Sequence, residues 1–311
     1  MTQGKFSTII TVIVILYLVS YLTSKFIVED GISNKIAVIP IEGTIGSSST
    51  KVPFQKIDAS SEKIISYIKD ANENKYIKGI LLDINSPGGT VVASREIAEA
   101  VKKSNKPVVA FINEIGTSGA YWIASASDKI ISDQLSITGS IGVIAGYLEF
   151  SELFEKYGVT YESLKSGKYK DIASPFKKMT EEERNILQKK LDLIHKRFIE
   201  AVAENRDLSK NSVEKLATGI YFLGEEAKDL GLIDILGTKE LAINITKELA
   251  NISEASLVEY KEAIGIFDLL SQIGAHSSFY IGKGIGSSLK EIDISKNLEI
   301  TFSVSKFSLL S

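Results

Sequence analysis

Ser118 is the residue best placed to do chemistry in this sequence, because small residues surround its hydroxyl. It lies in the run GTSGAYW at residues 116–122, at the start of a predicted helix. Glycines on both sides let the backbone turn sharply and let a substrate approach. The N–H groups at a helix N-terminus also stabilise a developing oxyanion. This pattern predicts that Ser118 is a nucleophile.

A serine nucleophile needs a base, and the composition of the chain limits the choice. The 311 residues include two histidines and no cysteine. We expect His195 to be a half-exposed residue of a long helix, and His276 to be a surface residue of a weakly patterned tail. A Ser-His-Asp triad is therefore disfavoured, and lysine becomes the main candidate for the base.

Three lysines in the segment LKSGKYKD are candidates for this base, namely Lys165, Lys168 and Lys170. A free lysine has a pKa of about 10.4 and serves as a base near neutral pH only where its surroundings lower that pKa to roughly 7–8. Asp171 would hold a neighbouring lysine in its charged form, so the hypothesis requires this carboxylate to point elsewhere. The residues of this segment leave the choice among the three lysines open.

Gly88 and Gly89 follow a predicted buried strand and could present backbone N–H groups to a substrate. The same pair could serve only as a tight connection between a strand and a helix. A Gly-Gly pair after a strand is also compatible with phosphate binding, but the dinucleotide and P-loop patterns are absent from the sequence.

Short apolar runs alternate with helical patterns along most of the chain, which predicts an α/β domain with a largely parallel sheet and flanking helices. We expect strands at 35–41, 79–84, 107–112, 129–132 and 141–144, and helices around 64–71 and at 91–103, 180–202, 212–217, 225–230 and 239–250. Active sites in such sheets lie at the carboxyl ends of the strands. The turn at Gly88 and the Ser118 run are therefore expected to share one edge of the sheet.

Residues 6–24 carry no charged side chain and would form roughly 28 Å of helix, close to the hydrocarbon thickness of about 30 Å. A cleaved signal peptide is disfavoured, because the apolar run is long and no Ala-x-Ala site follows it. We expect a single-pass anchor at 6–28 after a short cytoplasmic N-terminus at 1–5. The flanking charges favour the large domain on the extracytoplasmic side.

The net charge of −3 gives no reason to expect nucleic acid as a partner. The absence of cysteine excludes disulfides, thiolate metal sites and a cysteine nucleophile. The predicted serine chemistry calls for no metal and no cofactor.

Five motifs, in this order, resemble the signal peptide peptidase A family, which consists of membrane-anchored serine proteases related to the proteolytic subunit of Clp protease. They are DINSPGG at 83–89, TSGAY at 117–121, ITGSIGV at 137–143, KSGKYK at 165–170 and SPF at 174–176. The resemblance covers about residues 35–247. It implies the crotonase-like α/β fold of that family.

The resemblance also implies a role for individual residues. Ser118 matches the nucleophile, Lys170 the general base and Ser140 a hydroxyl that positions the lysine amine. Gly88 and Gly119 match the two residues whose N–H groups form the oxyanion hole. The resemblance thus selects Lys170 among the three lysines.

These expectations describe a membrane-anchored serine endopeptidase with a Ser/Lys dyad, in a ring-shaped homo-oligomer, that degrades cleaved signal peptides and other unfolded or exported polypeptides. The protease domain is expected at 29–250 and a C-terminal extension without an assigned role at 251–311. Whether the serine and the lysine pair within one chain or across subunits is left open. Two alternatives are a crotonase-type acyl-CoA enzyme and a non-catalytic, ring-forming membrane scaffold.

Overall fold

A largely parallel sheet forms the centre of the fold in the computed structural model, which describes residues 12–20, 34–47 and 57–261. Its strands are β1 (Lys35–Glu42), β4 (Ile77–Ser86), β5 (Val108–Thr117), β6 (Lys129–Ser132), β7 (Ile137–Gly139), β8 (Tyr221–Leu223), β9 (Ile235–Leu236) and β10 (Ser256–Glu259). The order β10-β1-β4-β5-β6-β9 is parallel throughout. The end of β5 pairs in parallel with β7, which pairs antiparallel with β8. The predicted parallel α/β fold is confirmed.

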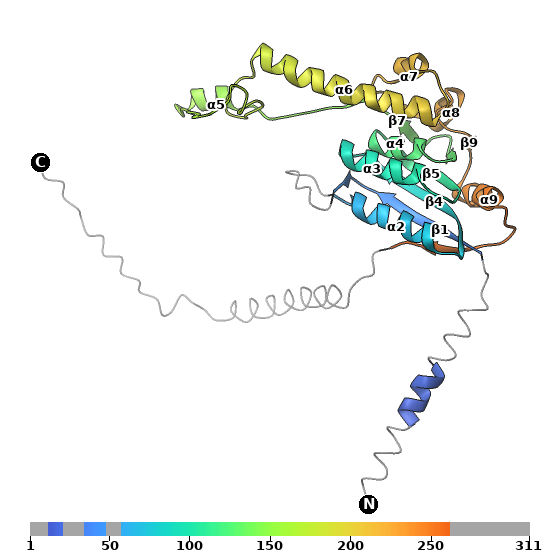
Figure 1. Ribbon diagram of the computed structural model, residues 1–311. Coiled ribbons are helices and arrows are strands. Elements are labelled where there is room, and N and C mark those ends of the chain that lie inside the picture. The colour runs from blue at the N-terminus through green and yellow to red at the C-terminus, as the bar shows by residue number, and fades with distance from the viewer. Residues whose placement is uncertain (1–11, 21–33, 48–56, 262–311) are drawn as a thin grey trace, which may run out of the picture. The chain divides into compact units, whose positions relative to one another are not determined.

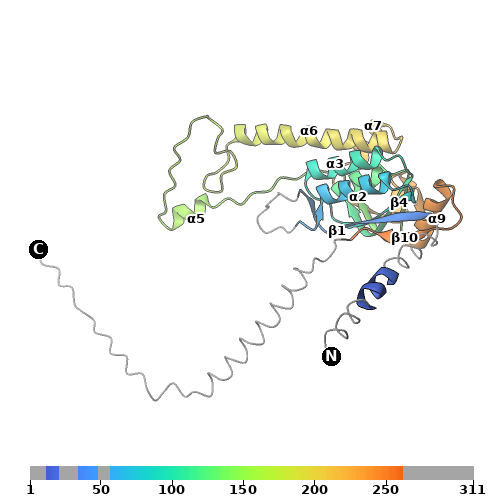
Figure 2. The same ribbon diagram turned by 60° about the horizontal axis from the view of Figure 1, so that its bottom comes forward.

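Helices cover both faces of this sheet. The helices named in the described chain are α2 (Ser61–Glu73), α3 (Val91–Lys102), α4 (Gly119–Ser125), α5 (Ser151–Lys156), α6 (Glu181–Asn205), α7 (Lys210–Leu216), α8 (Gly224–Asp229) and α9 (Lys239–Leu249). Helices α2 and α3 pack on one face and α9 packs on the other (Figures 1 and 2). A small second sheet pairs β2 (Ile45–Gly46) with β3 (Ala59–Ser60).

The central strands are apolar on both faces because both faces are covered. Leu82 and Ala110 point into the core beneath α2, α3 and α4, whereas Leu81 and Val109 pack with Ala242 of α9. A strand buried on both faces has a continuous apolar run in place of alternation. The runs in the sequence therefore located β4 and β5 correctly.

Helix α6 begins at the capping box that the sequence predicts. The Thr180 hydroxyl accepts from the Glu183 N–H at 3.2 Å, and the Glu183 carboxylate accepts from the Thr180 N–H at 2.9 Å. Further along, Phe198 stacks on Trp122 of α4 with ring centroids 4.5 Å apart. This contact packs α6 against the helix that follows Ser118.

The strand expected at 141–144 is wrong, because the strand in this region is β7 and residues 140–150 have no regular structure. The backbone turns where Gly139 and Ser140 both have positive φ, at 75° and 49°. After the turn, Ile141 is buried in the core while Ile144 is 96% exposed. Extended backbone cannot continue through two such residues.

The described fold extends past residue 250, where we expected the C-terminal extension to begin. Strand β10 pairs with β1, from Lys35 opposite Ser256 to Val38 opposite Glu259. Residues 262–311 lie outside the described part of the chain.

Residues 12–20 of the expected anchor are helical, and the rest of that segment lies outside the described residues. Within the described part of the chain, no helix combines the length and the apolar character needed to cross a membrane.

We predict that Tyr121→Phe lowers the free energy of unfolding by about 1–3 kcal/mol, because it leaves a buried carbonyl without its donor. The fully buried Tyr121 hydroxyl donates to the Leu232 carbonyl at 2.8 Å. Urea unfolding measures the change. Tyr157→Phe is the matched control, because Tyr157 is 71% exposed. An equal loss in both variants would contradict the prediction.

Burial also raises the pKa of Tyr121 above its ordinary value. Above about pH 10 the unfolded chain therefore releases this proton before the folded one does, and stability falls as pH rises. The free energy of unfolding of the Tyr121→Phe variant should therefore fall less steeply as the pH rises in this range.

Candidate active site

The turn at Gly88 and the Ser118 run meet at the carboxyl end of the sheet, as the sequence predicts. Strands β4 and β5 are neighbours, with Ser86 opposite Gly116, and each turn follows the end of its strand. A Cβ atom placed on Gly88 would lie 2.7 Å from the Gly119 nitrogen and 3.0 Å from the Ser118 Cβ. The two backbones are therefore in direct contact, and a side chain at Gly88 would separate them.

Ser118 lies in a strained turn between β5 and α4. Its φ is 53° and its ψ is −124°, a conformation that favours glycine and costs other residues about 1–3 kcal/mol. The Ser118 N–H donates to the Gly139 carbonyl at 2.8 Å, and the Ser118 carbonyl accepts from the Trp122 N–H at 3.0 Å. A serine on a sharp strand-to-helix turn is the geometry of a nucleophile elbow.

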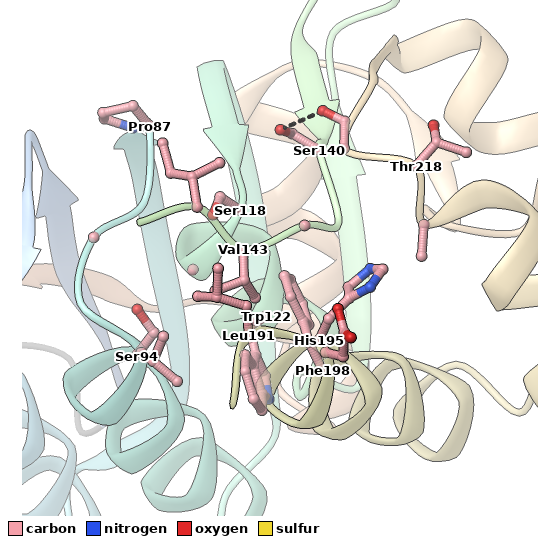
Figure 3. Close-up of a pocket in the computed structure, with 18 of the residues that line it drawn as sticks. Pro87, Ser94, Ser118, Trp122, Ser140, Val143, Leu191, His195, Phe198 and Thr218 are labelled. Carbon is pink, nitrogen blue, oxygen red and sulfur yellow. Dashed lines mark hydrogen bonds between the residues drawn. The ribbon is translucent and has the colours of Figure 1, made fainter. Parts of the chain in front are cut away.

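Ser118 opens into a cavity of about 470 Å³ (Figure 3). The loops at the end of the sheet form one part of its wall, and α4 and α6 form another. Trp122, Leu191 and Phe198 give it an apolar surface, while Ser140 and Thr218 line the part nearer β7 and the loop before β8. The cavity is large enough for a segment of a ligand rather than for a water molecule alone.

The N–H groups next to Ser118 differ in whether they already have an acceptor. The Gly88 N–H donates to the Ser86 hydroxyl at 3.1 Å. Within the described chain, the N–H groups of Gly89 and Gly119 have no acceptor, and both residues line the cavity. A Cβ on Gly119 would lie 3.3 Å from the Gly89 nitrogen, so these two amides are close together. The Gly-Gly pair signalled such a donor, but the sequence did not distinguish Gly89 from Gly88.

Ser140 lines the same cavity, and its own hydroxyl proton is already engaged. It has a φ of 49°, and its hydroxyl donates to the Gly219 carbonyl at 3.0 Å. The oxygen lone pairs are thus available to accept a hydrogen bond from an amine.

The three candidate lysines differ in their ion pairs. Lys165 pairs with Asp171 at 2.6 Å, and this contact lowers the pKa of that carboxyl. Lys168 pairs with Glu182 at 2.7 Å, which raises the pKa of Lys168 to about 12. Lys170 is exposed and makes no ion pair with any residue that the structure describes. The ion pairs of Asp171 in the described structure are with Lys165 and Lys177.

Lys170 does not line the Ser118 cavity of the same chain. The lysine segment is held at the beginning of α6, where Lys168 pairs with Glu182 and Lys177 pairs with Glu183. Phe198, which stacks on the helix of the nucleophile, lies about 22 Å further along the axis of α6 from Glu183. The structure therefore brings Ser118, Ser140, Gly88 and Gly119 together, and it does not bring Lys170 to them.

His195 is half-buried on α6, as predicted, but its ring lines the Ser118 cavity. Its Nε2 atom is buried and has no hydrogen-bond partner among the described residues. The sequence held a signal for this position, because His195 follows Leu191 by four residues and precedes Phe198 by three, on the apolar face of the helix. No group of acidic or histidine side chains in the described residues has the arrangement of a metal site.

Comparisons with known proteins match two family models to the chain. A model of peptidase family S49 matches residues 100–253, and a model of the NfeD1b N-terminal domain matches residues 36–149. The chain is 40% identical over 244 residues to a putative protease of Methanocaldococcus jannaschii. The aligned part covers 77% of this chain and 75% of that relative. It is 36% identical over 237 residues to a putative signal peptide peptidase SppA of Enterococcus faecium, and this match covers 75% of this chain and 69% of the relative.

Among solved structures, a serine-to-alanine mutant of a membrane-bound stomatin-specific protease superposes with a TM-score of 0.51. The match covers 74% of this chain and 99% of that one at 16% identity, so it supports the fold alone. The sequence relatives show the family. The chain belongs to peptidase family S49 and is a serine protease of the signal peptide peptidase A type.

Proposed function

We propose that this protein is an endopeptidase in which Ser118 attacks the peptide carbonyl and Lys170 acts as the general base. The observation that carries the proposal is the strained turn that holds Ser118 at the cavity, beside two N–H groups that have no acceptor among the described residues. A polypeptide carbonyl in this cavity would meet a nucleophile and hydrogen-bond donors together, which is the arrangement that acyl transfer requires.

The reaction runs through acylation and deacylation, each with two proton transfers. The Ser118 oxygen attacks the carbonyl carbon while its proton moves to the neutral amine of Lys170. The carbonyl oxygen becomes an oxyanion, and the resulting ammonium returns the proton to the leaving amine as the peptide C–N bond breaks. Water then attacks the acyl-enzyme, with Lys170 taking the proton from that water and returning it to Ser118.

We assign the oxyanion hole to the N–H groups of Gly89 and Gly119. The Gly88 N–H, which the family resemblance selects, already donates to Ser86, whereas the other two amides have no acceptor in the described structure. Gly88 instead allows the two backbones to approach each other. Loss of one oxyanion donor typically costs about 10²–10³ in rate.

The assignment of Lys170 rests on charge. A lysine base must be uncharged when it accepts a proton, and a neighbouring carboxylate would oppose this. Lys165 and Lys168 are both paired with carboxylates, and Lys170 pairs with none in the part of the chain that the structure describes. We assign to Ser140 the hydrogen bond that positions the amine, through the lone pairs that its bond to Gly219 leaves available.

We further propose that Lys170 acts in the cavity of a neighbouring copy within a ring-shaped homo-oligomer. Its own cavity lacks it, and the segment that carries it exposes many large apolar side chains, as an interface between copies would. These include Ile144, Leu148, Leu153, Tyr157, Val159 and Leu164.

For the substrates, we propose cleaved signal peptides and other unfolded or exported polypeptides, which the name of the Enterococcus relative supports.

We also propose that residues 6–28 anchor the protein in the cell membrane, with the catalytic domain on the extracytoplasmic side. The uncharged run at 6–24 supports this placement.

Ser118→Ala and Lys170→Ala should each lower the cleavage of a fluorogenic peptide by about 10³-fold or more, because each removes a group that the reaction requires. Lys168→Ala is the matched control and should keep most of the activity, since that ammonium is paired with Glu182. Labelling of Ser118 by a fluorophosphonate provides a second readout. Loss of activity in Lys168→Ala but not in Lys170→Ala would overturn the assignment.

Mixing the Ser118→Ala and Lys170→Ala proteins should restore activity if the dyad forms across subunits. After random assembly from equal amounts, about one quarter of the sites would combine an intact serine with an intact lysine. The control is Ser118→Ala mixed with a variant that carries both substitutions, which should stay inactive. No recovery in subunits shown to exchange would place both groups in one chain.

Deleting residues 1–28 should release the protein from a carbonate-washed membrane fraction, while fluorophosphonate labelling of Ser118 persists. The anchor would lie wholly in the deleted part, and the described sheet begins at Lys35. A truncated protein that stays in the membrane fraction would contradict the proposed anchor.

A further inference from the structure

We infer that the Ser118 cavity selects a substrate residue with an aromatic hydroxyl, a tyrosine, and that His195 is the residue that selects it. This inference rests on the proposed function and adds to it the chemistry of one substrate side chain. It assigns to His195 a role in specificity and no role in proton transfer to or from Ser118.

The first observation is the unpaired nitrogen of His195. Three buried side-chain polar atoms in the described structure have no hydrogen-bond partner: Asp83 Oδ1, Ser127 Oγ and His195 Nε2. Of their residues, only His195 lines the Ser118 cavity. Buried polar atoms in proteins nearly always have a partner, so an unpaired one on the wall of a binding cavity indicates a partner that arrives with the ligand.

The second observation is the apolar surface that lines the cavity together with Ser118 and His195. Trp122 follows Ser118 by one helical turn, and its ring stacks on Phe198 with an interplanar angle of 8°. Leu191 also contributes to this part of the cavity. Figure 3 shows the His195 imidazole extending toward the loop that carries Thr218. A side chain that enters beside Ser118 therefore meets an apolar surface in a cavity that also contains His195.

Tyrosine combines these two properties in one rigid side chain. Its ring packs against aromatic and aliphatic walls, and its hydroxyl lies at the far end. A hydroxyl can donate or accept, so it pairs with Nε2 in either tautomer of a neutral imidazole. Phenylalanine would fill the same apolar space and leave Nε2 buried without a partner.

The charges around His195 disfavour an acidic side chain in this position. Asp192 lines the same cavity, and its carboxylate accepts from the Gln188 amide at 2.7 Å. His195 and Asp192 also line a second cavity, whose other charged residues are Lys196 and Glu200 of α6 and Lys210 and Glu214 of α7. An incoming carboxylate would meet Asp192 at close range, whereas a neutral hydroxyl would not be repelled.

The test measures binding to the Ser118→Ala protein, so it does not require cleavage. Trp122 is the only tryptophan of the chain and lines the cavity, so its fluorescence reports an occupied site. Short peptides that carry one tyrosine, moved through each position in turn, are compared with the same peptides carrying phenylalanine. We expect one position at which the tyrosine peptide binds at least 10-fold more tightly.

Variants of His195 then test its part in this preference. His195→Phe should reduce the ratio of the two dissociation constants to about 1, because it removes the partner that the inference assigns to the hydroxyl. His195→Gln keeps a hydrogen-bonding side chain and should retain part of the ratio. Leu193→Phe is the matched control, since Leu193 lies on the same helix, is 57% exposed and does not line the cavity. That control should keep the full ratio.

The outcomes separate this inference from the proposed function. Equal binding of tyrosine and phenylalanine peptides at every position, or no binding of either kind, would overturn the inference, even if wild-type protein cleaves peptides. A tyrosine preference that survives His195→Phe would overturn the role of His195. A His195-dependent preference in a protein that cleaves no peptide would support the inference and refute the proposed protease reaction.

Discussion

The close approach of two backbones at the end of the sheet is the constraint on which the site depends. A side chain at Gly88 would collide with the Gly119 nitrogen and with the Thr117 carbonyl, so only glycine fits between the two turns. Strands β4 and β5 end side by side in the parallel sheet, and their register brings these turns together. This single contact places the Ser118 hydroxyl and the Gly89 N–H at one cavity. The pairing of strands thus sets the geometry of the proposed chemistry.

The parts of this arrangement that the sequence predicted are those that local patterns control. Buried parallel strands require continuous apolar runs, and β4 and β5 were located from such runs. The capping box of Thr180 and Glu183 depends on residues three apart, so it could be predicted exactly where α6 begins. The strand expected at 141–144 failed because apolar character alone does not reveal that Gly139 and Ser140 turn the chain.

Other features depend on contacts between distant residues and could not be predicted from local patterns. The Gly88 N–H is engaged because the Ser86 hydroxyl, itself bonded to the Gly43 carbonyl, turns toward it. The choice among the lysines likewise depends on where Asp171 and Glu182 point, and Glu182 belongs to another element. Local patterns give no reason to place His195 at a cavity, because only the packing of α6 against α4 brings its ring there. From the sequence it was therefore expected to be an ordinary helix residue.

The groups that we assign to catalysis and recognition share a property that folding alone does not favour. Ser118 holds a backbone conformation that costs about 1–3 kcal/mol, and an unpaired buried nitrogen such as His195 Nε2 costs a similar amount. Together these costs are a large fraction of a typical stability of about 5–15 kcal/mol, so the buried core must offset them. Lys165 and Lys168, which lie close to Lys170 in sequence, are by contrast fully paired. A donor or acceptor that is already engaged within the protein has no capacity left for a substrate, so a working site has to leave some donors and acceptors free until the substrate arrives.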